Sequence, residues 1–141
     1  MAEQAAKVAF VGLGVMGFPM AGHWAQGGFE VCVYNRNGAR AEAWLERYPG
    51  RAAPTPREAA AGAEVVALCV GNDDDVRSVV YGTEGVLEGM AQGSLLIDHT
   101  TASAALAREL AEACAARGVA FLDAPVSGGQ AGAEKDRKSV V

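Results

Sequence analysis

Residues 7–17 read KVAFVGLGVMG, and this stretch decides the fold. A short apolar run of strand-forming residues is followed by Gly12, Gly14 and Gly17. A segment of helical periodicity then extends over Met16–Gln26. Spaced glycines between a buried strand and a helix predict a tight strand-to-helix turn, with the helix packed closely on the strand.

The rest of the chain repeats the alternation of short apolar runs with longer, Ala-rich helical segments. The predicted strands are Lys7–Leu13, Glu30–Tyr34, Glu64–Val70, Ser94–Asp98 and Val119–Asp123, with Arg51–Ala53 as a short edge strand. The predicted helices are Met16–Gln26, Gly38–Tyr48, Pro56–Ala61, Asp73–Tyr81 and Ser103–Arg117, with Thr55 and Ser103 as caps. This alternation predicts an α/β domain with a doubly wound, mostly parallel Rossmann sheet.

Length and composition limit the class of protein. The chain has 141 residues, 50% of them hydrophobic, which is enough for one domain with a core. Its net charge of −5, without a basic segment, argues against nucleic acid as a partner. No segment approaches the roughly 20 apolar residues that a membrane helix needs. We therefore expect a cytoplasmic protein that binds neither nucleic acid nor membrane.

The cysteines and histidines do not form a metal or disulfide pattern. Cys32, Cys69 and Cys114 lie in apolar segments without C-x-x-C spacing, which predicts buried thiols in a reducing compartment. His23 and His99 have no partner at metal-ligand spacing, so we expect no metal site.

The glycine-rich turn has the properties of a phosphate-binding loop. Unpaired N–H groups at a helix N-terminus, together with the helix dipole, attract an anion. In such a loop Gly12 permits the tight turn, Gly14 lets the backbone approach a pyrophosphate, and Gly17 allows close helix–strand packing. The predicted cofactor-binding residues of this loop are Gly12, Leu13, Gly14, Val15, Met16 and Gly17.

The end of the second predicted strand bears on the choice between NAD and NADP. About 20 residues after the loop, NAD-binding proteins place an acid for the ribose hydroxyls, but this chain has Asn35 and Arg36. A carboxylate would repel a ribose 2′-phosphate, whereas Asn35 can donate hydrogen bonds and Arg36 can pair with the phosphate and stack on adenine. We therefore expect NADP in preference to NAD. The alternative is that Arg36 only caps a solvated strand end.

Two further polar segments follow predicted strands. Residues 98–101 read DHTT, and residues 123–129 read DAPVSGG. Both lie at carboxyl ends of strands, where open α/β sheets bind ligands. The hydroxyl of Ser127 and the N–H groups of Gly128 and Gly129 can face a substrate carboxylate, although the same tripeptide is common in ordinary turns.

The glycine-rich loop with Met20, followed by DAPVSGG at 123–129, resembles the 3-hydroxyisobutyrate dehydrogenase family of β-hydroxyacid dehydrogenases. The resemblance extends from about Lys7 to Glu134. It implies that residues 12–17 hold the pyrophosphate of the cofactor.

The same resemblance implies roles for residues after three other strands. Val70 and Gly71 would line the cofactor, and Thr101 would touch its nicotinamide side. The family usually has Leu-Pro where this chain has Val70-Gly71. The substrate carboxylate would be bound by Ser127, Gly128 and Gly129.

The resemblance also implies parts that this sequence lacks. In the family, a lysine on a later helix is the general acid/base, and an all-helical C-terminal domain closes the cleft and forms the dimer. We therefore expect residues 1–134 to be a partial NAD(P)-binding domain, without the final strands or a catalytic residue, taken from a homo-oligomeric parent. Residues 135–141 break the pattern, and the run Asp136–Val141 matches a translated sequencing adapter. We expect this tail to be non-native.

The implied activity is hydride transfer between NADP(H) or NAD(H) and a small 3-hydroxy acid or semialdehyde, such as 3-hydroxyisobutyrate or tartronate semialdehyde (2-hydroxy-3-oxopropionate). Three alternatives stay open. The chain can be a dinucleotide-binding module without catalysis, or part of an enzyme like 6-phosphogluconate dehydrogenase. A methyltransferase also has a glycine-rich loop after its first strand, but it normally has an acid near position 35, where this chain has Asn35.

Overall fold

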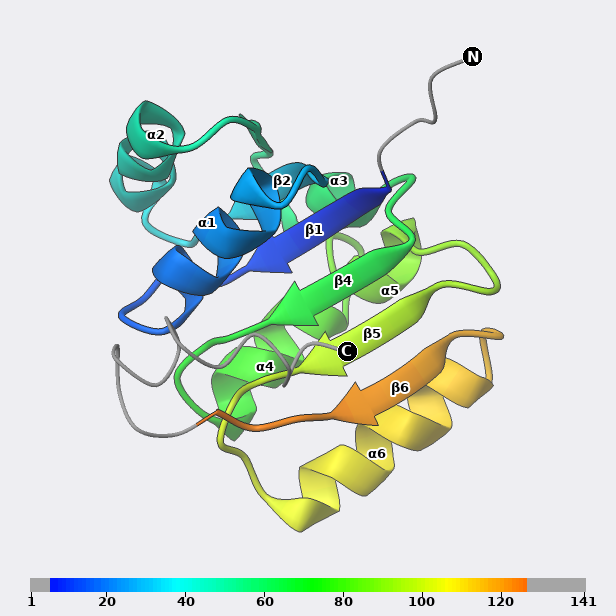
Figure 1. Ribbon diagram of the computed structural model, residues 1–141. Coiled ribbons are helices and arrows are strands. Elements are labelled where there is room, and N and C mark those ends of the chain that lie inside the picture. The colour runs from blue at the N-terminus through cyan, green and yellow to red at the C-terminus, as the bar shows by residue number, and fades with distance from the viewer. Residues whose placement is uncertain (1–5, 127–141) are drawn as a thin grey trace.

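The computed structural model describes residues 6–126, which form one parallel sheet flanked by helices (Figure 1). The strands are β1 (Lys7–Val11), β2 (Glu30–Tyr34), β3 (Arg51–Ala52), β4 (Val65–Leu68), β5 (Leu95–Asp98) and β6 (Ala120–Asp123). Their order is β3-β2-β1-β4-β5-β6, with every pairing parallel. The predicted doubly wound sheet is confirmed, including the short edge strand β3.

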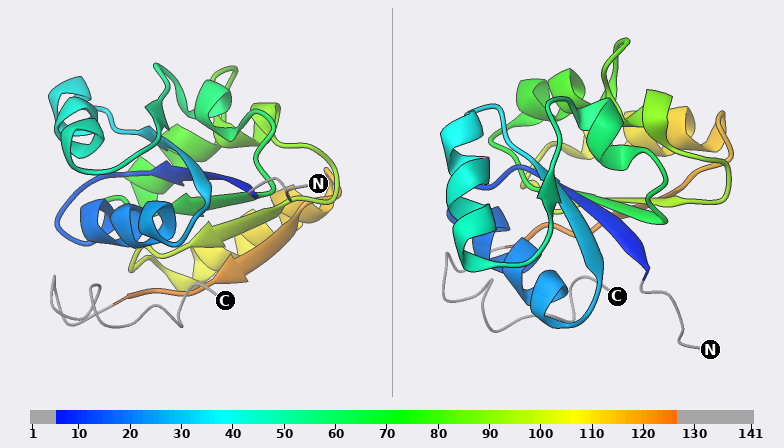
Figure 2. Two further views of the ribbon diagram at one scale, coloured as in Figure 1. Left: turned by 45° about the horizontal axis from the view of Figure 1, so that its top comes forward. Right: turned by 90° about the horizontal axis from the view of Figure 1, so that it is seen from above.

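Helices cover both faces of this sheet, as the two views in Figure 2 show. They are α1 (Gly17–Gln26), α2 (Gly38–Arg47), α3 (Pro56–Ala60), α4 (Asp73–Val80), α5 (Val86–Gly89) and α6 (Ala104–Ala115). Helices α1 and α2 pack on one face of the sheet, and α3 to α6 pack on the other. None of the helices within residues 6–126 is long and apolar enough to cross a membrane.

The sheet has two hydrophobic cores because alternate strand residues face opposite sides. In β1, Val8 and Phe10 pack against α1 and α2, whereas Ala9 and Val11 pack against the helices of the other face. All four side chains are buried. This explains why the strand reads as a continuous apolar run rather than an alternating one.

The structure corrects the ends of several predicted elements. Strand β1 ends at Val11 because Gly12 leaves the strand with φ of +103°. Strand β4 ends at Leu68 because the N–H of Val70 donates to Thr100 Oγ1 at 3.0 Å instead of to a neighbouring strand. Helix α5 was not predicted, since its four residues are too few to show a helical period.

The predicted caps are confirmed. Thr55 Oγ1 accepts from the N–H of Glu58 at 3.1 Å, and Ser103 Oγ accepts from the N–H of Leu106 at 3.0 Å. Because all strands are parallel, the loops that follow them lie along one edge of the sheet, where β1, β2 and β4 lead into α1, α2 and α4.

Candidate dinucleotide-binding site

A cleft of about 720 Å³ lies where β1, β2 and β4 end. Its lining includes all predicted cofactor residues except Thr101: Gly12, Leu13, Gly14, Val15, Met16, Gly17, Asn35, Arg36, Val70 and Gly71. It also includes residues that were not predicted to contact the cofactor, among them Cys69, Asp75, Ser78, Tyr81 and Glu84. The chain thus brings three separate predicted segments to one cavity.

The three glycines of the loop meet different surroundings. A Cβ at Gly12 would overlap the carbonyl of Cys69, and one at Gly17 would overlap the carbonyl oxygen of Gly12. In contrast, a Cβ at Gly14 would meet no atom within 4 Å. Gly12 and Gly17 are therefore needed for packing, whereas Gly14 leaves open space on the cleft side for another molecule.

Helix α1 begins without a cap of its own. Met16, at the N-cap position, makes no side-chain capping hydrogen bond, and the first turn contains no acidic residue. The N–H groups of Gly14, Val15 and Met16 have no hydrogen-bond partner among residues 6–126. Unpaired N–H groups at a helix N-terminus suit a phosphate, so the loop fits the pyrophosphate of a dinucleotide.

Two side chains fix the backbone of this loop from the α2 side. Asn35 Oδ1 accepts from the N–H of Leu13 at 2.9 Å, and Asn35 Nδ2 donates to the carbonyl of Asn37 at 3.1 Å. Arg40 Nε donates to the carbonyl of Leu13, and its guanidinium lies 4.3 Å from the centre of the Phe18 ring. Asn35 was predicted as a cofactor contact, and in the structure its amide holds the loop.

The role of Arg40 was missed. Its spacing of four residues from Arg36 gave no sign that its guanidinium would bind a carbonyl of the glycine-rich loop.

Arg36 extends into solvent at the edge of the cleft. Its side chain is 85% exposed, and Nη1 lies 3.8 Å from Oδ1 of Asp75, in the first turn of α4. The charged residues lining the cleft are Arg36, Asp75 and Glu84. Arg36 is thus the positively charged residue in the lining of the cleft.

Cys69 departs from the prediction of three buried thiols. Cys32 and Cys114 are buried as predicted. Cys69 is only partly buried, because it follows the end of β4 and lines the cleft. Burial, and secondarily the charge of Asp98, raise the pKa of Cys69 to about 11. The thiol is therefore protonated at neutral pH and is a poor nucleophile.

The segment after β5 connects neighbouring strands. The carboxylate of Asp98 is buried and accepts from the N–H of Thr100 at 2.9 Å, and burial raises its pKa. His99 is buried with Nδ1 2.7 Å from the carbonyl oxygen of Ala124, and burial lowers its pKa. Thr101 Oγ1 donates to the carbonyl of Val126 at 3.4 Å. The contacts of His99 and Thr101 connect this segment to the chain as it leaves β6.

The predicted substrate residues Ser127, Gly128 and Gly129 lie outside the described residues, as does the tail at 135–141. The bond from Thr101 reaches Val126, the last described residue before them.

The chain matches a family model over residues 7–141, described as the NAD binding domain of 6-phosphogluconate dehydrogenase. An uncharacterized oxidoreductase of Shewanella frigidimarina is 59% identical over 136 residues, which are 96% of this chain and 47% of that protein. A probable mitochondrial 3-hydroxyisobutyrate dehydrogenase-like protein of Arabidopsis thaliana is 37% identical over 95% of this chain and 44% of its own length. The chain therefore spans less than half the length of these curated relatives.

Solved structures show the same fold. The 3-hydroxyisobutyrate dehydrogenase of Mycobacterium tuberculosis, solved with L-serine, has a TM-score of 0.85 and 29% identity over 96% of this chain and 48% of that one. An imine reductase of Myxococcus stipitatus in complex with NADP+ has a TM-score of 0.79 and 26% identity over 89% of this chain and 42% of its own. Its V8 variant, in complex with NAD+, scores 0.80 at 25% identity with the same coverage. Both cofactors thus occur among the neighbours.

Proposed function

We propose a function for this chain that follows from its family. The chain belongs to the 3-hydroxyisobutyrate dehydrogenase family and corresponds to the N-terminal NAD-binding domain of these oxidoreductases. The chain is the cofactor-binding part of an enzyme that transfers hydride between a nicotinamide dinucleotide and a small 3-hydroxy acid or semialdehyde. Candidate substrates are 3-hydroxyisobutyrate and tartronate semialdehyde.

The uncapped start of α1 is the observation that carries this proposal. It combines free N–H groups, open space at Gly14 and a cleft that extends to the ends of β2 and β4. In the proposed complex the pyrophosphate binds at residues 12–17, and the adenosine half extends toward Arg36. Val70 and Gly71 line the path of the cofactor, and Thr101 lies on its nicotinamide side.

The proposed preference for NADP rests on Arg36. The guanidinium is positioned at the cleft edge, with no aspartate or glutamate at position 35. A charge-assisted hydrogen bond to the 2′-phosphate is worth about 1.5–3 kcal/mol when shielded and less in an exposed site. Asn35 supports this preference indirectly, because it positions the loop without adding a negative charge.

The residues of this chain bind and orient the cofactor and the substrate, while the bound cofactor supplies the hydride chemistry. Ser127, Gly128 and Gly129 are proposed to hold the substrate carboxylate. Proton transfer is assigned to a lysine beyond this chain. Because general acid/base catalysis typically supplies about 10²- to 10⁴-fold, residues 1–141 alone are expected to show no measurable turnover.

A chimera tests the proposal. Residues 1–134 of the chain are joined to the C-terminal half of the Shewanella frigidimarina relative. The formation of NAD(P)H is then followed by its absorbance with one of three substrates: 3-hydroxyisobutyrate, the reduced form of tartronate semialdehyde, or 6-phosphogluconate. We expect activity with a small 3-hydroxy acid, and none from the unfused chain. The control chimera carries Gly14→Val, which closes the open space at the loop.

Three outcomes would contradict the proposal. Activity only with 6-phosphogluconate would favour the enzyme class named by the family model. Tight dinucleotide binding by a folded chimera without turnover on any substrate would favour a binding module. Turnover by the unfused chain would refute the assignment of proton transfer to a residue outside it.

A further inference from the structure

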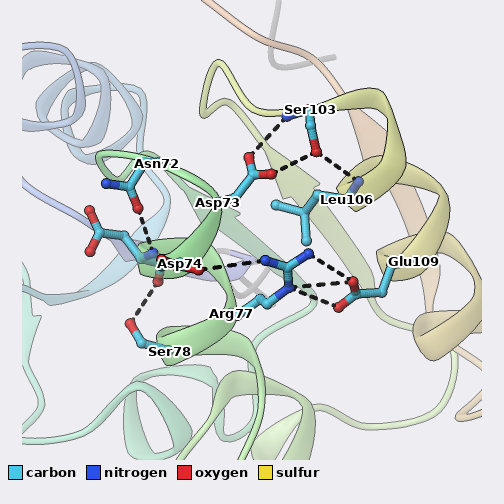
Figure 3. Close-up of polar contacts among 9 residues, drawn as sticks. Asn72, Asp73, Asp74, Arg77, Ser78, Ser103, Leu106 and Glu109 are labelled. Atoms are coloured by element: carbon cyan, nitrogen blue, oxygen red, sulfur yellow. Dashed lines mark hydrogen bonds and ion pairs between the residues drawn. The ribbon is translucent and has the colours of Figure 1, made fainter.

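Helix α4 begins with three consecutive aspartates whose side chains have three different surroundings; Figure 3 labels the first two, Asp73 and Asp74. Asp73 faces α6, where its carboxylate accepts from the N–H of Ser103 at 2.9 Å and from its hydroxyl at 2.6 Å. These bonds lower the pKa of Asp73. Asp74 is 95% exposed and lies 3.6 Å from Arg77. Two of the three aspartates therefore serve the contact between helices or face solvent.

The contact between α4 and α6 is complete without the third aspartate. Arg77, one turn after Asp73, pairs with Glu109 of α6 at 3.1 Å. Figure 3 shows this pair beside the bonds from Asp73 to Ser103. The two helices are thus held together at both ends of the first turn of α4 by Asp73 and Arg77.

Asp75 faces the cleft instead. Its side chain is 30% exposed, lines the cavity and lies 3.8 Å from Arg36. A Cβ at Gly71 would overlap its Oδ2, so the carboxylate stands directly beside the loop after β4. Its own N–H is capped by Asn72 Oδ1 at 2.9 Å, which fixes the start of the helix from which the carboxylate projects.

We propose that Asp75 is a specificity-determining residue that weakens the preference for NADP by competing with the 2′-phosphate for Arg36. This inference rests on the proposed dinucleotide site. In the ligand-free state Arg36 pairs with Asp75, and a 2′-phosphate must share or replace that partner. A carboxylate beside a phosphate of nearly two negative charges also opposes it directly. NAD carries no 2′-phosphate, so its binding does not involve this competition.

The test compares Asp75→Asn with Asp74→Asn in the full chain, by fluorescence titration with NADPH and with NADH. Both changes remove one negative charge from the first turn of α4, but only position 75 lines the cleft. Asp75→Asn is expected to tighten NADPH binding about threefold to tenfold, because it removes one negative charge near the phosphate in a solvent-exposed, high-dielectric site. It is expected to change NADH binding less than about twofold. The gain should shrink at 1 M salt, where charges are screened within about 3 Å. Asp74→Asn should leave both affinities nearly unchanged.

A double variant tests whether the effect passes through Arg36. In an Arg36→Ala background, Asp75→Asn should improve NADPH binding by less than it does in the unaltered chain. An equal improvement in both backgrounds, or an equal effect of Asp74→Asn, would overturn the inference. So would an unchanged ratio of NADPH to NADH affinity in a folded Asp75→Asn variant. Failure of the unaltered chain to bind either dinucleotide is a distinct result, and it would refute the proposed site together with this inference.

Discussion

Helices α1 and α4 start at the same edge of the sheet, after the adjacent strands β1 and β4, but their first turns are built in opposite ways. Helix α1 has neither a capping side chain nor an acidic residue at its start. Helix α4 has both, with Asn72 as cap and Asp73 to Asp75 in the first turn. The positive end of α4 is thus neutralised by the chain itself, whereas the positive end of α1 is left for an external anion. Of these two helix starts, the start of α1 is therefore the one that we propose as the phosphate site.

The largest expected effect separates glycines that the fold needs from one that the ligand needs. Gly12→Ala should lower the free energy of unfolding by about 2–4 kcal/mol, because a left-handed backbone and overlap with a carbonyl each add a cost. Gly14→Ala should leave the unfolding curve unchanged, since its Cβ meets no atom of the chain. It should weaken NADPH binding about 5- to 150-fold, corresponding to about 1–3 kcal/mol of crowding.

Chemical denaturation followed by tryptophan fluorescence, together with NADPH titration, distinguishes these glycine variants. A Gly14→Ala protein that binds NADPH normally would show that the open space at this glycine is not where the dinucleotide lies.

A substitution at Val15 makes the first turn of α1 resemble that of α4, which carries acidic residues. Val15 is 62% exposed beside the free N–H groups of the loop. Val15→Asp places a carboxylate there, which should weaken binding of both NADH and NADPH about tenfold through repulsion of the pyrophosphate. Val15→Asn, of the same size but uncharged, is the control and should retain most of the affinity. Equal losses in the two variants, measured by calorimetry, would mean that side-chain shape rather than charge decides binding at this helix.

A somewhat smaller effect concerns the end of β2. Arg36→Ala should weaken NADPH binding several-fold to about tenfold, because the lost ion pair is exposed, with little change for NADH. Asn35→Asp keeps an acceptor for the N–H of Leu13 and adds a charge, so it should shift the preference toward NADH. Equal losses of both cofactors in Arg36→Ala would show that Arg36 packs on adenine only.

Asn35→Leu, in contrast, removes the acceptor that holds Leu13. It should weaken NADH and NADPH alike, because the pyrophosphate loop then loses one of its two side-chain anchors. Titration of both cofactors with each Asn35 variant separates the positioning of the loop from the selection of the ribose.

Local patterns predicted the fold well because short βα units are encoded by neighbouring residues. The apolar runs and the caps Thr55 and Ser103 each depend on a few positions in sequence, and the structure confirms them. The turn between β1 and α1 was predicted from the same kind of local pattern. What the sequence did not reveal are contacts between distant segments: Arg40 with the carbonyl of Leu13, and Asp75 with Arg36. Neither residue has a motif, and only the folded chain shows that one aspartate of three faces the cleft.

The smallest expected effect lies at the cap of α4. Asn72→Ala removes the acceptor for the N–H of Asp75 and should lower the free energy of unfolding by about 1 kcal/mol. The loss should be the same with and without NADPH, because α4 is capped by the chain and not by the ligand.

The start of α1, in contrast to that of α4, is expected to be stabilised by the ligand. NADPH should slow hydrogen exchange of the N–H groups at Gly14 to Met16, which have no partner among residues 6–126, and leave exchange at the start of α4 unchanged. This contrast follows from the assignment of the external anion to α1 alone, since a bound phosphate takes the place there that Asn72 and the aspartates occupy in α4. Protection of both helix starts to the same extent would mean that the ligand tightens the whole sheet edge, and the difference between the two first turns would then not determine where the phosphate binds.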